Sequence, residues 1–296
     1  MMDFFLSFTK FNTPSVFKFG LVCALLTLNL GRVTQSVHAQ EQTSLLEVKK
    51  QAIRNGNLTP SSLILSESQQ KAIGWLYVGG RASNRFCTAT VISDNAVLTA
   101  KHCFYGKEAP PLNSEFHFAI LSDQGINNQR ENPVSEAFEP EEVFRFYAGD
   151  IWPSTDYDIA MVRFADRPFA RVGLSAIPIN IHPLEGEFGQ NLLSSYVDVV
   201  GFGDTQHDNE KGRYFASVKL ELITPTYIIT NGEQEQGICN GDSGGPTFIK
   251  GRLSGVTSRA SLKQIKENST VVKTCAKGPN VLMSVFKFRA WIQSKL

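Results

Sequence analysis

Cys239-Asn240-Gly241-Asp242-Ser243-Gly244-Gly245-Pro246 is the stretch that decides the fold of this 296-residue chain. Its glycines allow the backbone to turn sharply and to bring amide groups close to a ligand. A serine hydroxyl alone is a poor nucleophile, so a serine in such a turn needs a base and hydrogen-bond donors for a developing oxyanion. The stretch also fits G-x-S-x-G, the nucleophile turn of α/β-hydrolases. Without chemistry, it is a glycine-rich turn around a buried aspartate.

The order of the histidines along the chain separates these interpretations. An α/β-hydrolase places its histidine after the serine, and none of the five histidines follows Ser243. The opposite order, His then Asp then Ser, is that of chymotrypsin. Two earlier segments supply it, Leu98-Thr99-Ala100-Lys101-His102-Cys103 and Asp156-Tyr157-Asp158-Ile159-Ala160.

Three motifs carry a resemblance to the chymotrypsin/trypsin-like serine protease family. They are T-A-x-H-C at 99–103, D-I-A at 158–160 and G-D-S-G-G-P at 241–246, in the order of the family. The resemblance covers residues 63–296 and implies an all-β fold: two antiparallel six-stranded β-barrels, chymotrypsin-like, with a C-terminal α-helix. It also implies a serine-type endopeptidase. Because fold alone does not fix activity, a catalytically silent binding protein on the same fold is the alternative.

The pattern of apolar residues agrees with such a fold. Short runs rich in β-forming residues, split by Gly, Pro or Asn, favour antiparallel sandwiches or barrels over βαβ units. Near the C-terminus, apolar residues recur at helical spacing from Val285 to Leu296 and predict an amphipathic helix. The runs that predict strands are 73–79, 86–92, 96–100, 116–121, 143–147, 159–164, 196–200, 215–223 and 247–249.

The family resemblance assigns a role to each residue of the motifs. Ser243 is the nucleophile, His102 transfers its proton, and Asp158 holds the imidazole and stabilises the imidazolium. The backbone amides of Gly241 and Ser243 form the oxyanion hole. Asp156 lies two residues before Asp158, but alignment with D-I-A favours Asp158.

The same resemblance assigns the substrate-binding residues. Gly237, six positions before the nucleophile, is the base of the S1 pocket, Ile238 is a wall, and Ala260 and Asn280 occupy the neck. Ser258 supports the aspartate through its hydroxyl and meets the substrate with its backbone. Because no acid stands at the base, we expect an uncharged, medium-sized S1 residue rather than Arg or Lys.

The beginning of the chain predicts export. Residues 1–39 read as a signal peptide, with Lys10 and Lys18 before a short apolar run and small residues at a cleavage site. Residues 40–62 are expected to be a propeptide or a loose segment, and 63–296 the protease domain. By resemblance, Asp242 pairs with the amine freed on zymogen activation, near Ser61 to Leu65. We therefore expect a secreted protein, extracellular or periplasmic.

Four cysteines remain once the signal peptide is removed, and four cysteines allow three pairings. The family resemblance implies Cys87–Cys103, beside the histidine, and Cys239–Cys275, beside the serine. An oxidising compartment makes free thiols the less favoured state.

Composition excludes several classes of partner. The net charge is +1, so no basic field points to nucleic acid or to a membrane surface. The acidic residues between Glu131 and Glu142 lack the convergent order of a calcium loop and read as a solvated loop. We expect no metal and no cofactor, a monomer, protein or peptide substrates, and a protein inhibitor as a further partner.

Overall fold

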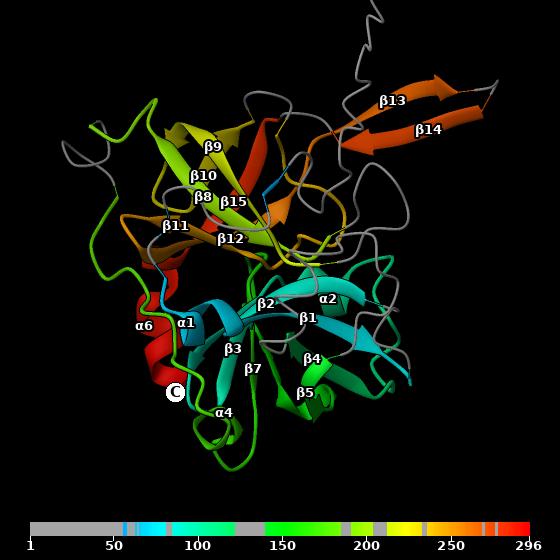
Figure 1. Cartoon of the computed structure of the whole chain (residues 1–296), viewed down its shortest axis with the longest axis vertical. Helices are drawn as coiled ribbons and strands as arrows, with labels where there is room; N and C mark the ends of the chain where they lie inside the picture. Colours follow the sequence, from blue (N-terminus) through cyan, green and yellow to red (C-terminus); the bar gives the residue numbers. More distant parts are fainter. Residues whose placement is uncertain are drawn as a thin grey trace, which may run out of the picture. The chain divides into compact units, whose positions relative to one another are not determined.

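The computed structural model describes two antiparallel sheets, a separate β-hairpin and several short helices (Figure 1). The described residues are 56–57, 63, 65–80, 85–121, 140–184, 191–203, 212–232, 236–267, 270–275 and 278–296. The predicted signal peptide and most of the predicted propeptide lie outside these residues, as does the acidic segment 131–139.

The first sheet has seven strands in the order β5-β4-β1-β2-β3-β7-β6. It forms a half-barrel, because no ladder joins β5 to β6 among the described residues. Its strands are β1 (Ile73–Val78), β2 (Arg85–Ser93), β3 (Ala96–Thr99), β4 (Phe116–Leu121), β5 (Pro140–Phe146), β6 (Ile151–Pro153) and β7 (Ala160–Arg163).

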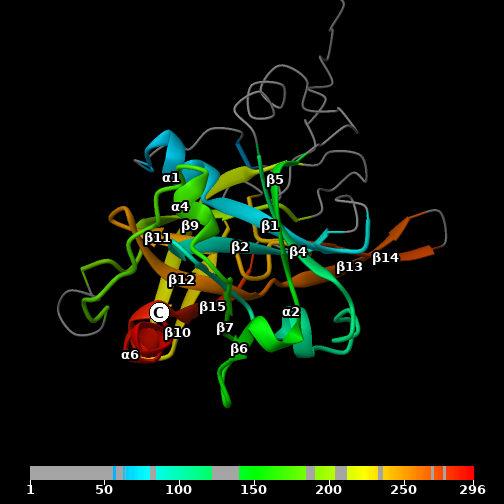
Figure 2. The same ribbon diagram turned by 90° about the horizontal axis from the view of Figure 1, so that it is seen from below.

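The second sheet closes into a six-stranded barrel, in the order β10-β15-β12-β11-β8-β9. Its strands are β8 (Tyr196–Gly201), β9 (Tyr214–Ile223), β10 (Tyr227–Asn231), β11 (Pro246–Ile249), β12 (Arg252–Arg259) and β15 (Asn280–Ser284). Between β12 and β15 the chain forms a hairpin of β13 (Leu262–Glu267) and β14 (Thr270–Cys275), which projects away from the barrel in both views (Figures 1 and 2). The sequence did not predict this hairpin.

Most helices are single turns that close loops. They are α1 (Glu67–Lys71), α2 (His102–Tyr105), the 3-10 helix η1 (Ala148–Asp150) and α4 (Pro168–Arg171). The longer α6 (Val285–Lys295) is the predicted C-terminal helix, and it buries Val285, Phe288 and Ile292. None of the helices in the described part of the chain has the length and apolar composition that a membrane span needs.

Thr88 of β2 joins the two sheets. Its side chain is buried, and its hydroxyl donates to the carbonyl oxygen of Gly241 at 2.9 Å and accepts from the amide of Phe202 at 3.0 Å. Its amide donates to the carbonyl oxygen of Ser243 at 2.8 Å. A single residue of the first sheet therefore fixes the loop around Ser243, residues 239–246, which we call the serine loop.

Close contact at this junction requires a glycine at position 244. Gly244 has a φ of +84°, and a Cβ atom there would lie 2.0 Å from Thr99 Oγ1 and 2.3 Å from the carbonyl oxygen of Thr88. Any side chain would separate the serine loop from β2 and β3.

We predict that Thr88→Val lowers the free energy of unfolding by roughly 1–3 kcal/mol, because valine can neither donate to the Gly241 carbonyl nor accept from the Phe202 amide and so removes two buried hydrogen bonds. Urea unfolding measures the change. Thr90→Val is the matched control, since Thr90 lies buried on the same strand and its hydroxyl has no hydrogen-bond partner in the described part of the chain. Equal destabilisation by the two substitutions would contradict this role for Thr88.

Candidate active site

His102 lies on α2, the single turn that follows β3. Two contacts anchor this turn to the first sheet. Phe104 packs among the aromatic rings of the core, 5.4 Å from the ring of Phe116, and Cys103 forms a disulfide with Cys87 of β2. These two contacts, made by the two residues that follow His102, restrict where its imidazole can lie.

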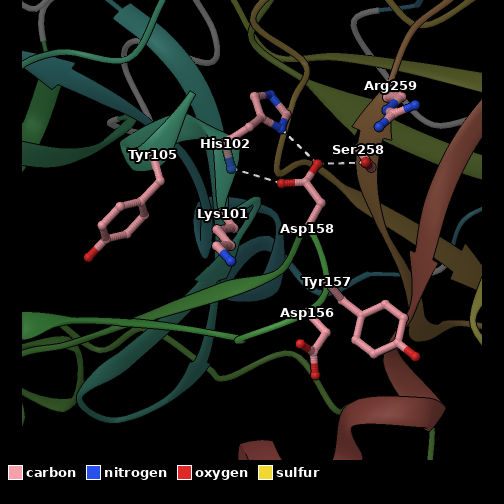
Figure 3. Close-up of a pocket in the computed structure, with 8 residues that line it drawn as sticks. All are labelled: Lys101, His102, Tyr105, Asp156, Tyr157, Asp158, Ser258 and Arg259. Carbon is pink, nitrogen blue, oxygen red and sulfur yellow. Dashed lines mark hydrogen bonds and ion pairs between the residues drawn. The ribbon is translucent and has the colours of Figure 1, made fainter. Parts of the chain in front are cut away.

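Asp158 connects this turn to the second barrel (Figure 3). Its Oδ1 accepts a hydrogen bond from the amide of His102 at 2.8 Å, and its Oδ2 lies 2.7 Å from His102 Nδ1. The same Oδ2 accepts from the hydroxyl of Ser258, on β12, at 2.6 Å. The carboxylate therefore fixes both the backbone and the ring of His102.

The surroundings of Asp158 favour its ionised form. Burial acts to raise the pKa of its carboxyl, but the hydrogen bonds and charge of His102, together with the hydroxyl of Ser258, outweigh it, and the pKa lies below the ordinary value of 3.8. Asp158 thus remains a carboxylate at neutral pH and can stabilise a positive imidazolium.

Asp156 is differently placed. Its carboxylate accepts a hydrogen bond from Thr155 at 3.1 Å, and Figure 3 shows it on the opposite side of Asp158 from the imidazole. Of the two neighbouring aspartates, Asp158 is the one that contacts His102.

The serine loop presents two amides without partners. Gly244 N donates to the carbonyl of Thr257, and Gly245 N donates to that of Asp242. Within the described residues, by contrast, the amides of Gly241 and Ser243 donate to no acceptor. The positive φ of Gly241, 86°, turns the backbone at this point. The loop thus exposes two donors beside the hydroxyl of Ser243.

Ser243 and His102 line the same cavity, which has a volume of about 510 Å³. Among the described residues the hydroxyl of Ser243 has no hydrogen-bond partner, so the bond to the imidazole is not formed in this state. Such bonds are often long or misaligned in enzymes without substrate and form when substrate binds.

Asp242, the residue before Ser243 in this loop, has a buried side chain. Its carboxylate accepts hydrogen bonds from the amides of Gly203 and Cys239, each at 2.8 Å. A Cβ atom on Gly201 would lie 2.0 Å from its Oδ1, so the glycine there makes room for the carboxylate.

The predicted S1 residues lie around the second disulfide. Gly237, Ile238 and Asn280 are buried, and Ala260 is partly exposed. The side-chain oxygen of Asn280 accepts from the amide of Ser261 at 3.1 Å, which joins the two sides of the predicted neck. The disulfide Cys239–Cys275, which the family resemblance implied, links the serine loop to the end of β14.

A second cavity lies beside His102, and the sequence did not predict all of the residues that line it. Its volume is about 450 Å³, and it is lined by Asp158, Ser258, Arg259, Lys101 and Tyr105, among others. A metal ligand set is not formed there or at the serine, because the one cluster of ligand-type side chains among the described residues contains Cys87 and Cys103, which are joined as a disulfide.

Comparisons with known proteins agree with this geometry. The family model described as Trypsin matches residues 64–292. The chain belongs to the trypsin family. Among curated proteins, this trypsin-family chain is 28% identical to snake venom serine protease 3 of Craspedocephalus gramineus, over 72% of its length and 78% of the relative. It is 25% identical to chymotrypsin-like elastase family member 1 of Macaca fascicularis, over 74% of its length and 82% of the relative.

Solved structures show the same fold. The atomic-resolution structure of HBP matches with a TM-score of 0.54 and 17% identity, over 80% of this chain and 96% of that one. Neuropsin, a serine protease of mouse brain, matches with a TM-score of 0.53 and 15% identity, over 80% and 99%. The predicted all-β, chymotrypsin-like fold is confirmed, and this trypsin-family member is a serine-type endopeptidase that acts on proteins or peptides.

The lowered pKa of Asp158 predicts how stability depends on pH. A carboxyl whose folded-state pKa is depressed contributes stability above its unfolded-state pKa and loses it as pH falls through the folded-state value. The difference in unfolding free energy between wild type and Asp158→Asn should therefore be constant near neutral pH and decrease below about pH 4. Urea titrations from pH 7 to pH 3 measure it. A difference that grows on acidification would contradict the assignment.

Proposed function

We propose that this protein is a secreted serine endopeptidase in which Ser243, His102 and Asp158 form the catalytic triad. The observation that carries the proposal is that Asp158 binds both the amide and Nδ1 of His102, and that His102 and Ser243 line one cavity. Few structural roles require a carboxylate to fix the orientation of an exposed imidazole.

The bond to Asp158 determines how the imidazole acts. With Nδ1–H donating to the carboxylate, the other nitrogen, Nε2, is free to accept a proton. Ser243 Oγ attacks the peptide carbonyl as its proton passes to His102 Nε2, and the imidazolium then protonates the leaving amine. In the second half of the reaction, water attacks the carbonyl carbon of the acyl-enzyme as its proton passes to His102 Nε2, and the imidazolium then returns a proton to Ser243 Oγ.

The free amides of Gly241 and Ser243 support an oxyanion hole. Among the described residues both lack partners, so they can bind the developing negative charge without breaking another hydrogen bond. Losing one such donor costs about 3–4 kcal/mol of transition-state stabilisation in comparable enzymes. The S1 pocket is proposed from Gly237, Ile238, Ala260 and Asn280, and it suits an uncharged side chain of medium size.

We predict that Ser243→Ala lowers kcat by about 10⁶-fold, since complete loss of a triad has that effect in subtilisin. Asp158→Asn should lower it by about 10⁴-fold, because the imidazole takes the wrong tautomer. Asp156→Asn is the control and should keep near wild-type activity on labelled casein.

A fluorophosphonate probe separates the protease from a silent binding protein. The probe should label native wild-type protein and fail to label both heated protein and Ser243→Ala. Absence of labelling in folded wild-type protein would favour the binding protein instead.

The structure bears on where the zymogen is cut. Asn57 forms two backbone hydrogen bonds with Phe215 of β9, at 2.6 and 2.8 Å, and Gly56 is buried. Leu63 and Leu65 are also buried in the core. A cut at the predicted position, near Ser61 to Leu65, would detach the segment that pairs with β9, so these contacts favour a cut before Gly56.

Phe215 pairs with Val200, next to Gly201, which contacts Asp242. A terminus just before Gly56 would therefore begin near the buried carboxylate that is proposed to receive its amine. N-terminal sequencing of the active secreted protein should give a start upstream of Gly56. A start between Ser61 and Leu65 would refute the revised position and restore the earlier one.

A further inference from the structure

Arg259 extends the proposed active site. It follows Ser258, whose hydroxyl binds Asp158, at the end of β12. Both residues line the 450 Å³ cavity beside His102. Figure 3 shows the guanidinium on the same side of Asp158 as the imidazole.

The guanidinium is exposed and has no hydrogen-bond or ion-pair partner among the described residues. The other groups of the cavity do not neutralise it. Lys101 donates to the carbonyl of Thr155 at 2.8 Å, Asp158 is bound by His102 and Ser258, and Asp156 lies on the far side of Asp158 in Figure 3. Arg259 is therefore a cation that lines the cavity and, among the described residues, forms an ion pair with neither of its two carboxylates, Asp156 and Asp158.

Most other arginines in the described chain form such contacts, and Arg252, at the far end of β12, is the exception. They include Arg145 with Glu115, Arg167 with Asp94, Arg171 with Asp166, and Arg289 with the carbonyl of Phe286. An arginine without a partner next to a reactive centre is suited to bind a carboxylate of a ligand, because its planar donors match that geometry.

The backbone at Arg259 can receive an extended peptide. On one side it pairs with Val281 of β15. On the other side, the hydrogen bonds between β12 and the serine loop end at Thr257, which bonds to Gly244 and Gly245. Beyond Thr257 this edge of β12 is open among the described residues, and an extended chain can add to such an edge as a further strand.

The position of Arg259 in the strand indicates which substrate residue it meets. The family resemblance assigns its neighbours Ser258 and Ala260 to binding of the substrate residue whose carbonyl carbon is attacked. Side chains alternate between the two faces of a strand, so Arg259 faces the other way from Ala260 at the S1 neck. The substrate residues on that face are the second and the fourth before the cut bond.

We propose that Arg259 is a specificity-determining residue that selects Asp or Glu at the second or fourth position before the cut bond. This inference rests on the proposed function, since it presupposes that Ser243 cuts the peptide. It adds an acidic substrate class to a protease whose S1 pocket is proposed to take an uncharged residue.

The test uses a fluorogenic peptide that the active protein cleaves, made with Glu, Gln or Lys at each of the two positions. Wild type should cleave one of the Glu peptides with a kcat/KM roughly tenfold above that of the matched Gln peptide, as expected for a charge-assisted contact at a partly solvated site. Arg259→Gln should abolish this ratio, and Arg259→Glu should favour the Lys peptide.

Two controls distinguish selection from structural damage. Arg252→Gln removes an exposed arginine from the other end of β12, about 20 Å away along the strand, and should keep the wild-type ratio. Raising the salt concentration should reduce the ratio of wild type but not that of Arg259→Gln, because solvent-exposed charges are screened.

The outcomes separate this inference from the proposed function. If wild type is not labelled by the fluorophosphonate probe, the proposed function fails. If it is labelled and cleaves the peptides with equal kcat/KM for Glu and Gln at both positions, the role of Arg259 alone is refuted.

Discussion

The structure depends on the hydrogen bonds that Thr88 makes across the junction of the two sheets. The proposed nucleophile and its proposed base come from different sheets, so their separation is set by how those sheets dock. Thr88 donates hydrogen bonds to the carbonyl oxygens of Gly241 and Ser243. The residue before it, Cys87, forms a disulfide with Cys103, which follows His102. The serine loop and the turn that contains His102 are therefore both anchored to one short segment of β2.

Asp158 provides the second link across the junction. It precedes β7 of the first sheet and receives a hydroxyl from Ser258 on the second barrel. Its hydrogen bonds overcome the cost of burying a carboxylate, which is why its pKa falls rather than rises. The contacts of Asp158 therefore both orient the imidazole of His102 and hold the two sheets together.

Much of this could be predicted from sequence because the motifs are local. The run around Ser243, the turn containing His102 and the D-I-A segment each combine residues a few positions apart, and their order along the chain identifies the fold. Strands such as β4 and β8 followed from apolar runs, since packing and propensity agree there.

Other features depend on contacts between distant residues and were not predictable in the same way. The pairing of Asn57 with Phe215 spans a long stretch of chain, and no pattern near Asn57 indicates it. Nothing in the sequence around Thr88 indicates its role, which depends on the contact of β2 with the serine loop. Arg259 belongs to no motif, and its importance emerges only from the cavity it shares with His102. The short strand β6, which gives the first sheet its seventh strand, also lies outside the apolar runs that the sequence offered.

The hairpin of β13 and β14 has a consequence for how this protein can diversify. Its last residue, Cys275, is covalently bonded to Cys239, just ahead of the serine loop. The base of the hairpin is therefore clamped, and a change of length or composition toward its tip is mechanically insulated from the residues that follow Cys239. The tip of this hairpin can therefore vary while the loop that carries Ser243 keeps its position.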